Sequence, residues 1–533
     1  MNDMISPTSP HAELLALPAV ELRRRIGARQ LSPVELLEAC IERIEALNPH
    51  VNAITATAYG RARVEARAAE AAVMRGEPLG LLHGLPLGVK DLEETAGLLT
   101  TYGSPIYRAN VPAADNLLVA RLRAAGAVVT AKTNVPEMGA GANSFNAVWG
   151  ATGNPFDPRL NAGGSSGGSA CALALDLLPL CTGSDTGGSL RIPAAKCGVV
   201  GFRPSPGLVP SARRPLGWSP LPVVGPMGRC VADACLQLAA SAGVDAADPL
   251  SFPVDAAGFL RLPLPDLGRL RVGITEDWGV CDVDEDIRAA FRAKVAALAP
   301  LFRSVHTLDF AGEHALGEVH RCFDVLRAEA FVAGLHEAYE RDPASLGPNP
   351  RVNYEMGARM SLLDVAWAQS EQTRMVRRFA RVFDEVDLVL SPVTPVSPFP
   401  WTEPHAAVVQ GRPQANYYRW LALTYVTTLT THPALSLPCG RDARGLPFGL
   451  QLVGPFRGDA VTLAAAQAME QAFAADPVLA RPRPDPARLG PVEPALRSIV
   501  TAPPVLDGAA AAPGGERGLN AFSRCCAARP RPR

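Results

Sequence analysis

Residues 163–169 read GGSSGGS and residues 183–191 read GSDTGGSLR, with a short apolar run between the two stretches. Consecutive glycines allow a backbone turn to aim several N–H groups at one point. A serine in such a turn can attack a carbonyl while the N–H groups bind the developing oxyanion. The second stretch therefore makes Ser189 a candidate nucleophile, and together with the first stretch and Lys90 it supplies the groups that an amide-cleaving serine enzyme needs. We expect its oxyanion hole to be made of backbone N–H groups from Thr186, Gly187, Gly188 and Ser189.

The candidate base is Lys90, which follows the apolar residues 85–89. Burial lowers the pKa of a lysine because it disfavours the ammonium form, and a neutral amine can accept the serine proton. Ser165 is a suitable hydroxyl to relay that proton. No histidine lies close to either stretch in the sequence. A serine–histidine–aspartate arrangement stays open at this point, since residues distant in sequence can meet in the fold.

Each of these features also has a simpler interpretation. A glycine- and serine-rich stretch by itself is more typical of a flexible loop or a phosphate-binding loop. However, neither stretch ends in the Gly-Lys-Ser/Thr signature of a P-loop, and neither has GxGxxG spacing. An isolated lysine after a strand is usually a solvated surface group. The combination of all three features favours the catalytic interpretation.

Lys90 and the two stretches resemble the amidase signature family in sequence and in spacing, and the resemblance extends over about residues 15–480. It implies that Ser189 is the nucleophile, Ser165 a bridging serine that follows a cis peptide bond, and Lys90 the base. It also implies supporting roles for Ser166, Asp185 and Arg191, and it implies neither a cofactor nor a metal ion.

The alternation of strand-like and helix-like segments from Leu85 onward predicts an α/β fold, a single α/β/α domain around a large mixed sheet. We expect the domain to span residues 1–480. Its parts would be a helical N-terminal segment, a catalytic core, and a flank with a C-terminal core, at about 12–75, 80–230 and 231–480. Residues 481–533 are rich in Pro, Ala and Arg, which predicts a disordered tail.

The amino-acid composition limits the kinds of partner that we expect this protein to bind. Lys and Arg total 51 and Asp and Glu total 52, so no excess of positive charge indicates a nucleic-acid surface. No apolar run is long enough to suggest a membrane span, and the N-terminus lacks a signal pattern. We therefore expect a cytoplasmic enzyme, either a monomer or a homo-oligomer, that acts on a small-molecule amide. Its cysteines are expected to be small buried side chains.

Three functions compete. The first is an amide hydrolase that works through an acyl-enzyme. The second is the A subunit of the glutamine-dependent amidotransferase that amidates mischarged tRNA, in which the same triad would release ammonia from glutamine. The third is a non-catalytic binding protein on the same scaffold. Residues that would line the substrate pocket are expected in three segments, 138–145, 323–331 and 417–425.

Overall fold

The computed structural model of the protein describes residues 11–212, 214–492 and 494–506. Eleven strands form one large sheet: β1 (Ile54–Thr57), β2 (Pro86–Lys90), β3 (Val128–Thr133), β6 (Leu180–Asp185), β7 (Val200–Arg203), β8 (Val223–Gly228), β9 (Arg271–Ile274), β10 (Ser304–Thr307), β11 (Leu388–Pro392), β14 (Ala434–Arg441) and β15 (Pro447–Val453). Their order across the sheet is β1-β3-β2-β6-β8-β7-β14-β15-β11-β9-β10. Two short strand pairs lie outside it, β4 (Phe145–Asn146) with β5 (Gly150–Ala151), and β12 (Val408–Val409) with β13 (Arg412–Pro413).

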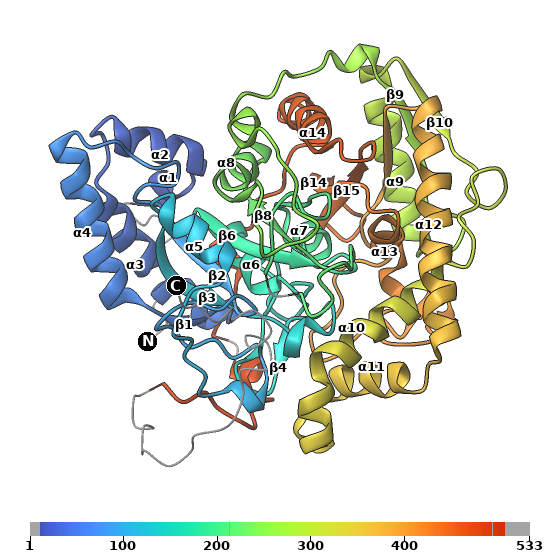
Figure 1. The fold of residues 1–533 in the computed structure, drawn as a ribbon. Helices are drawn as coiled ribbons and strands as arrows, with labels where there is room; N and C mark the ends of the chain where they lie inside the picture. The colour runs from blue at the N-terminus through green and yellow to red at the C-terminus, as the bar shows by residue number, and fades with distance from the viewer. Residues whose placement is uncertain (1–10, 213, 493, 507–533) are drawn as a thin grey trace, which may run out of the picture.

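The α-helices of the described residues are α1 (Ala12–Leu15), α2 (Ala19–Gly27), α3 (Pro33–Val51), α4 (Tyr59–Arg75), α5 (Leu117–Ala124), α6 (Gly167–Ala174), α7 (Arg191–Cys197), α8 (Val231–Ser241), α9 (Glu285–Leu298), α10 (Val319–Arg341), α11 (Pro348–Ala358), α12 (Leu362–Glu385), α13 (Ala422–Leu429) and α14 (Asp459–Phe473). Figure 1 shows α1–α5 gathered at one end of the sheet and α9–α12 at the other. Helices α6 and α7 pack on its centre, as do α8 and α14. None of the described helices is long and apolar enough to cross a membrane.

The sheet is mixed, and its parallel part positions the candidate catalytic residues. Strand β2 is parallel to β3 and to β6, whereas β6 is antiparallel to β8. Every residue of β2 and β3 is buried, as is typical of parallel strands that are covered on both faces. Because β2 and β6 are parallel neighbours, Lys90 at the end of β2 and the 186–189 turn after β6 reach the same edge of the sheet.

This architecture confirms the predicted α/β fold around a large mixed sheet. In the N-terminal part, the expectation of an entirely helical segment up to residue 75 is wrong. Helix α4 begins only at Tyr59, and the preceding strand β1 pairs antiparallel with β3 at the sheet edge. The β-branched residues Ile54, Thr55 and Thr57 suit a strand, and the alanine-rich composition that follows masks this short signal.

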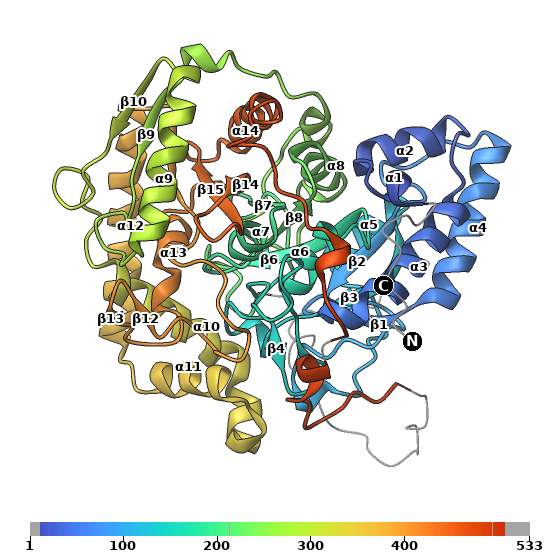
Figure 2. The ribbon, with the colours of Figure 1, turned by 180° about the vertical axis from the view of Figure 1, so that it is seen from behind.

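The structure corrects the expectation of disorder for part of the tail. Residues 481–492 and 494–506 lie against the domain, and the C-terminal part of the chain, red in Figure 2, runs along its surface. Leu489 and Leu496 are buried, and the Leu496 side chain packs with Ala151 and Trp401. The Arg481 Nε donates to the carbonyl of Gly198 at 2.8 Å. The segment is therefore docked by buried leucines and by hydrogen bonds despite its composition. Residues 507–533 lie outside the described residues.

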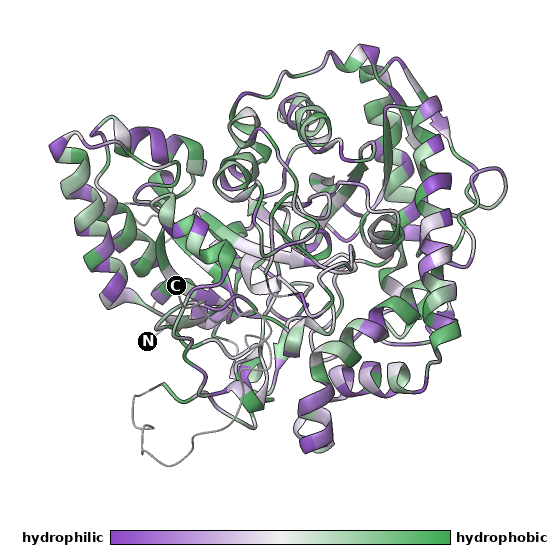
Figure 3. Cartoon of the chain, in the orientation of Figure 1, coloured by the Kyte–Doolittle hydropathy of each residue, from purple (hydrophilic) through white to green (hydrophobic). Residues whose placement is uncertain are grey.

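Most of the core is one large apolar cluster that includes both the sheet and the helices packed on it, and three smaller clusters lie beside it. Surface helices have mixed composition, and in Figure 3 hydrophilic and hydrophobic residues alternate along α4 and α12. Cys171, Cys181, Cys197 and Cys235 are free and buried, which confirms that these cysteines serve as small core residues.

Candidate active site

Lys90, the last residue of β2, is fully buried. Its Nζ lies 2.8 Å from the Ser165 Oγ and 2.9 Å from the Ser184 Oγ. Burial lowers the pKa of Lys90 to about 7, although the nearby Glu93 and Asp185 partly oppose the shift. A lysine in this state holds an appreciable fraction of neutral amine near pH 7, as a general base needs. Ser184 was not predicted as a site residue.

Ser165 and Ser166 connect the two glycine- and serine-rich stretches. The Gly164–Ser165 peptide bond is cis, as the resemblance implies. The Ser166 N–H donates to the Ser189 carbonyl at 3.3 Å, and the Ser166 Oγ lies 3.5 Å from the Ser184 carbonyl. Ser166 therefore joins the loop of the expected relay to the turn of the expected nucleophile.

The turn that carries Ser189 differs in one respect from the expected oxyanion hole. The Gly188 N–H donates to the Asp185 Oδ1 at 2.8 Å and is therefore already paired. The N–H groups of Thr186, Gly187 and Ser189 have no protein acceptor within the described part of the chain. Three of the four expected donors therefore stay available.

Gly188 is required by this geometry. Its φ is +125°, and a Cβ there would lie 2.2 Å from the Thr424 Oγ1. The same Thr424 hydroxyl donates to the Gly187 carbonyl at 2.7 Å. Helix α13 thus fixes the turn from outside, and any side chain at position 188 would displace it.

Asp185 is the buried centre of a charged cluster. Arg191 donates to it from Nε and Nη2, both at 3.0 Å, and Arg203 lies 3.4 Å away. Burial disfavours the carboxylate, but the two guanidinium groups outweigh burial and lower the pKa of Asp185 to about 2. Arg191 continues to α13, where it donates to the Thr424 carbonyl, and to the Gln451 Oε1 on β15. The supporting positions expected for Asp185 and Arg191 agree with this network; Arg203 was not predicted.

Three of the serines described above line one cavity of about 290 Å³. Its lining includes Ser165, Ser184, Thr186, Gly187 and Ser189. All three segments expected to line a pocket contribute to it, through Met138, Gly139, Gly141, Arg327, Ala330, Phe331 and Leu421. The cavity therefore brings the candidate nucleophile and the candidate relay to the same space.

No histidine is among the described residues that line this cavity, whereas Lys90 contacts the lining residue Ser165, so Lys90 is the base candidate that the geometry supports. Across the described residues, no group of three or more His, Cys, Asp or Glu side chains is arranged to hold a metal ion.

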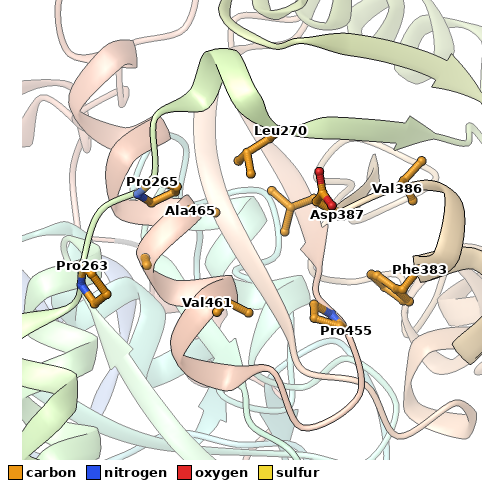
Figure 4. Close-up of a pocket in the computed structure, with 11 residues that line it drawn as sticks. Pro263, Pro265, Leu270, Phe383, Val386, Asp387, Pro455, Val461 and Ala465 are labelled. Atoms are coloured by element: carbon orange, nitrogen blue, oxygen red, sulfur yellow. The ribbon is translucent and has the colours of Figure 1, made fainter.

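A second cavity, of about 340 Å³, lies between β9, β11 and α14 (Figure 4). Its walls are mostly apolar, with Asp387 as the titratable side chain among the residues that line it. Neither Lys90 nor any of the candidate serines borders it. This cavity therefore has no part in the chemistry described above.

The fold and the buried lysine–serine pair are compatible with an amide-cleaving enzyme, and comparison with known proteins identifies the family. The family model described as Amidase matches residues 35–463. The chain therefore belongs to the amidase signature family.

Two curated relatives are each named as the A subunit of glutamyl-tRNA(Gln) amidotransferase. The protein from Anaeromyxobacter sp. (strain K) is 35% identical, with 90% of this chain and 100% of the relative covered. The protein from Acaryochloris marina (strain MBIC 11017) is 34% identical, with 84% of this chain and 96% of the relative covered.

Solved structures with the same fold include hydrolases. A bacterial aryl acylamidase of the amidase signature family superposes with a TM-score of 0.79 at 28% identity, covering 86% of this chain and 96% of that one. A 6-aminohexanoate cyclic dimer hydrolase gives a TM-score of 0.76 at 27% identity, with 86% and 97% covered.

Proposed function

We propose that this protein cleaves the C–N bond of a carboxamide through an acyl-enzyme on Ser189. The observation that carries the proposal is the 2.8 Å contact between the buried Lys90 Nζ and the Ser165 Oγ, beside the cavity that Ser189 also lines. A neutral lysine amine, a relay hydroxyl and a nucleophilic serine are the groups that this reaction requires.

In the proposed acylation step, the Ser189 Oγ attacks the amide carbonyl carbon and its proton passes through Ser165 to Lys90. Charge on the carbonyl oxygen is stabilised by free N–H groups of the 186–189 turn. The Lys90 ammonium then returns the proton, through Ser165, to the leaving nitrogen as the C–N bond breaks. Water, deprotonated by Lys90, releases the acid and regenerates Ser189.

The acceptor of the leaving ammonia or amine separates two candidate functions. The curated relatives favour the A subunit of a glutamine-dependent amidotransferase, because they match at 34–35% identity over almost their whole length. Solved amidase and hydrolase structures at 27–29% identity support a hydrolase less strongly. A non-catalytic binding protein is disfavoured, since Lys90, Ser165 and Ser189 are all present and lie at one site.

One experiment tests both candidates. Ammonia or amine release is measured for glutamine, simple primary amides and anilides, with the chain alone and with amidotransferase partner subunits added. Turnover of simple amides by the chain alone supports the hydrolase. Glutamine turnover that requires the partner subunits supports the amidotransferase function. If no amide is cleaved and Ser189 takes up no fluorophosphonate, the proposed chemistry is wrong.

A further inference from the structure

One wall of the active-site cavity is a face of α10, which lies apart from the strand and turn that carry the serines. Arg327, Ala330, Phe331, Gly334 and Leu335 all line the cavity. Their spacing of three and four residues places them on the same side of a helix. This face is apolar apart from Arg327, so a single guanidinium group provides its charge.

Arg327 is buried, with 6% of its surface exposed. Its Nε donates to the Asn353 Oδ1 at 3.1 Å, and its Nη2 donates to the Tyr417 hydroxyl at 2.6 Å. Aromatic rings surround it, with the guanidinium carbon 5.0 Å from the Phe331 ring centre and 4.9 Å from that of Tyr418. All of these partners are neutral.

No carboxylate among the described residues forms an ion pair with Arg327. The other arginine of the cavity, Arg214, is paired with Asp248. Glu93, which also lines the cavity, accepts a hydrogen bond from the Asn116 side chain. Buried charges are normally paired, because leaving one without a counter-ion costs free energy. A guanidinium has five N–H donors, and only two of those of Arg327 are assigned above.

We infer that Arg327 binds a carboxylate of the substrate, so that the preferred amides carry a negative charge away from the scissile bond. An arginine forms strong, directional hydrogen bonds with a carboxylate, and the surrounding aromatic rings exclude water from the pair. The inference rests on the proposed function and narrows its substrate class. It applies both to glutamine, which has an α-carboxylate, and to monoamides of dicarboxylic acids.

Matched substrates test this inference on the unaltered protein. Glutaramate ends in a carboxylate where pentanamide ends in a methyl group, and the two amides are otherwise the same. Adipamate and hexanamide form a second such pair, each longer by one methylene. We expect ammonia release with a kcat/KM about 10- to 100-fold higher for the charged member, the range that hydrogen bonds to charged groups supply. Equal kcat/KM within both pairs would overturn the inference. Glutamine against glutaramate then shows whether an α-ammonium group is also recognised.

Variants at position 327 assign the preference to this residue. Arg327→Met should abolish the preference, mainly through KM, so that kcat/KM for glutaramate falls to about that for pentanamide. Arg327→Lys should restore part of it, because a lysine keeps the charge but not the planar fork. Arg321→Met is the matched control, since Arg321 lies on the same helix, is half-exposed and does not line the cavity. A uniform loss for charged and neutral amides would indicate a purely structural role and contradict the inference.

A binding measurement separates failure of this inference from failure of the proposed reaction. Calorimetry with Ser189→Ala compares glutaramate with pentanamide in the absence of turnover. If glutaramate binds preferentially but the wild-type protein is inactive, the carboxylate-binding role of Arg327 is supported and the proposed reaction is wrong. Turnover without any binding preference would keep the reaction and reject the carboxylate site. Fluorophosphonate labelling of Ser189 in the Arg327 variants shows that they are folded.

Discussion

The carboxylate of Asp185 accepts a hydrogen bond, at 2.8 Å, from the backbone N–H of Gly188 inside the turn that carries Ser189. The same carboxylate binds Arg191 and lies beside Arg203. The turn is thus held at its centre by a buried anion, while Thr424 fixes it from α13. One potential oxyanion donor is used to shape the turn in which the other three lie.

Replacing Asp185 should destabilise the protein strongly. Asp185→Asn leaves two buried guanidinium groups without their counter-ion, which should cost about 3–5 kcal/mol of unfolding free energy. Urea unfolding of the purified variant measures this. Asp157→Asn is the control, because the Asp157–Arg159 pair lies at the surface and its loss should cost less than about 1 kcal/mol. Similar losses in the two variants would contradict the assigned role of Asp185.

The stabilising effect of Asp185 should also depend on pH. Its folded pKa of about 2 lies below the ordinary value of 3.8, so the contribution is fully present above about pH 4. It is lost as the pH falls through about 2. The difference in unfolding free energy between wild type and Asp185→Asn, measured from pH 2 to 6, should therefore shrink only at the acidic end.

Activity should rise with pH through about 7. Lys90 acts as a base only when neutral, and burial places its pKa at about 7. The measurement is kcat/KM against pH for an amide substrate, and Lys90→Ala should remove most of the turnover. Lys196→Met is the control, because burial also lowers the pKa of Lys196 to about 7, yet its Nζ donates to the Asn161 Oδ1 and not to a candidate serine. A pH midpoint that moves with Lys196 instead would reject Lys90 as the base.

Ser189 should carry the acyl group. Ser189→Ala should show no acyl adduct by mass spectrometry after brief exposure to substrate and should unfold at the same temperature as the wild type. Ser219→Ala, a change outside the cavity, should acylate normally. An adduct on a residue other than Ser189 in the wild type would move the nucleophile elsewhere.

The docked C-terminal segment should contribute to stability. Leu496→Ala removes a buried side chain from its contacts with Ala151 and Trp401 and should cost about 2–5 kcal/mol. Val492→Ala is the control, since Val492 is 50% exposed and its loss should change stability by less than about 0.5 kcal/mol. Thermal unfolding compares the two. Equal melting temperatures would show that the segment adds nothing to the stability of the domain.

The candidate site residues could be proposed from the sequence because they lie in contiguous motifs. Lys90, Ser165 and Ser189 were each identified from local sequence, and the structure places the first two within hydrogen-bond distance. The pairing of Gly188 with Asp185 was not predictable, because a glycine-rich turn indicates only that N–H groups can converge. Which of these N–H groups donates a hydrogen bond to another residue depends on three-dimensional packing.

Other features were missed because their signals are non-local or weak. Arg203 reaches Asp185 from β7, which β8 separates from β6 in the sheet, and no spacing rule in the sequence connects the two residues. The strand β1 is four residues long and precedes an alanine-rich helix. In the tail, Leu489 and Leu496 are buried although the segment is rich in proline and arginine, and the average composition of a segment does not reveal the burial of single residues.

The reacting groups and the facing wall of the cavity come from separate parts of the chain. Lys90, Ser165 and Ser189 belong to the sheet and its adjoining loops, whereas Arg327 and its neighbours belong to α10, more than a hundred residues later. Under the proposed function, substitutions along one face of a single helix would alter which molecules enter and leave the proposed reacting groups unchanged. For the engineer, α10 offers a compact stretch to randomise, and a library built there would vary selectivity on a fixed reaction.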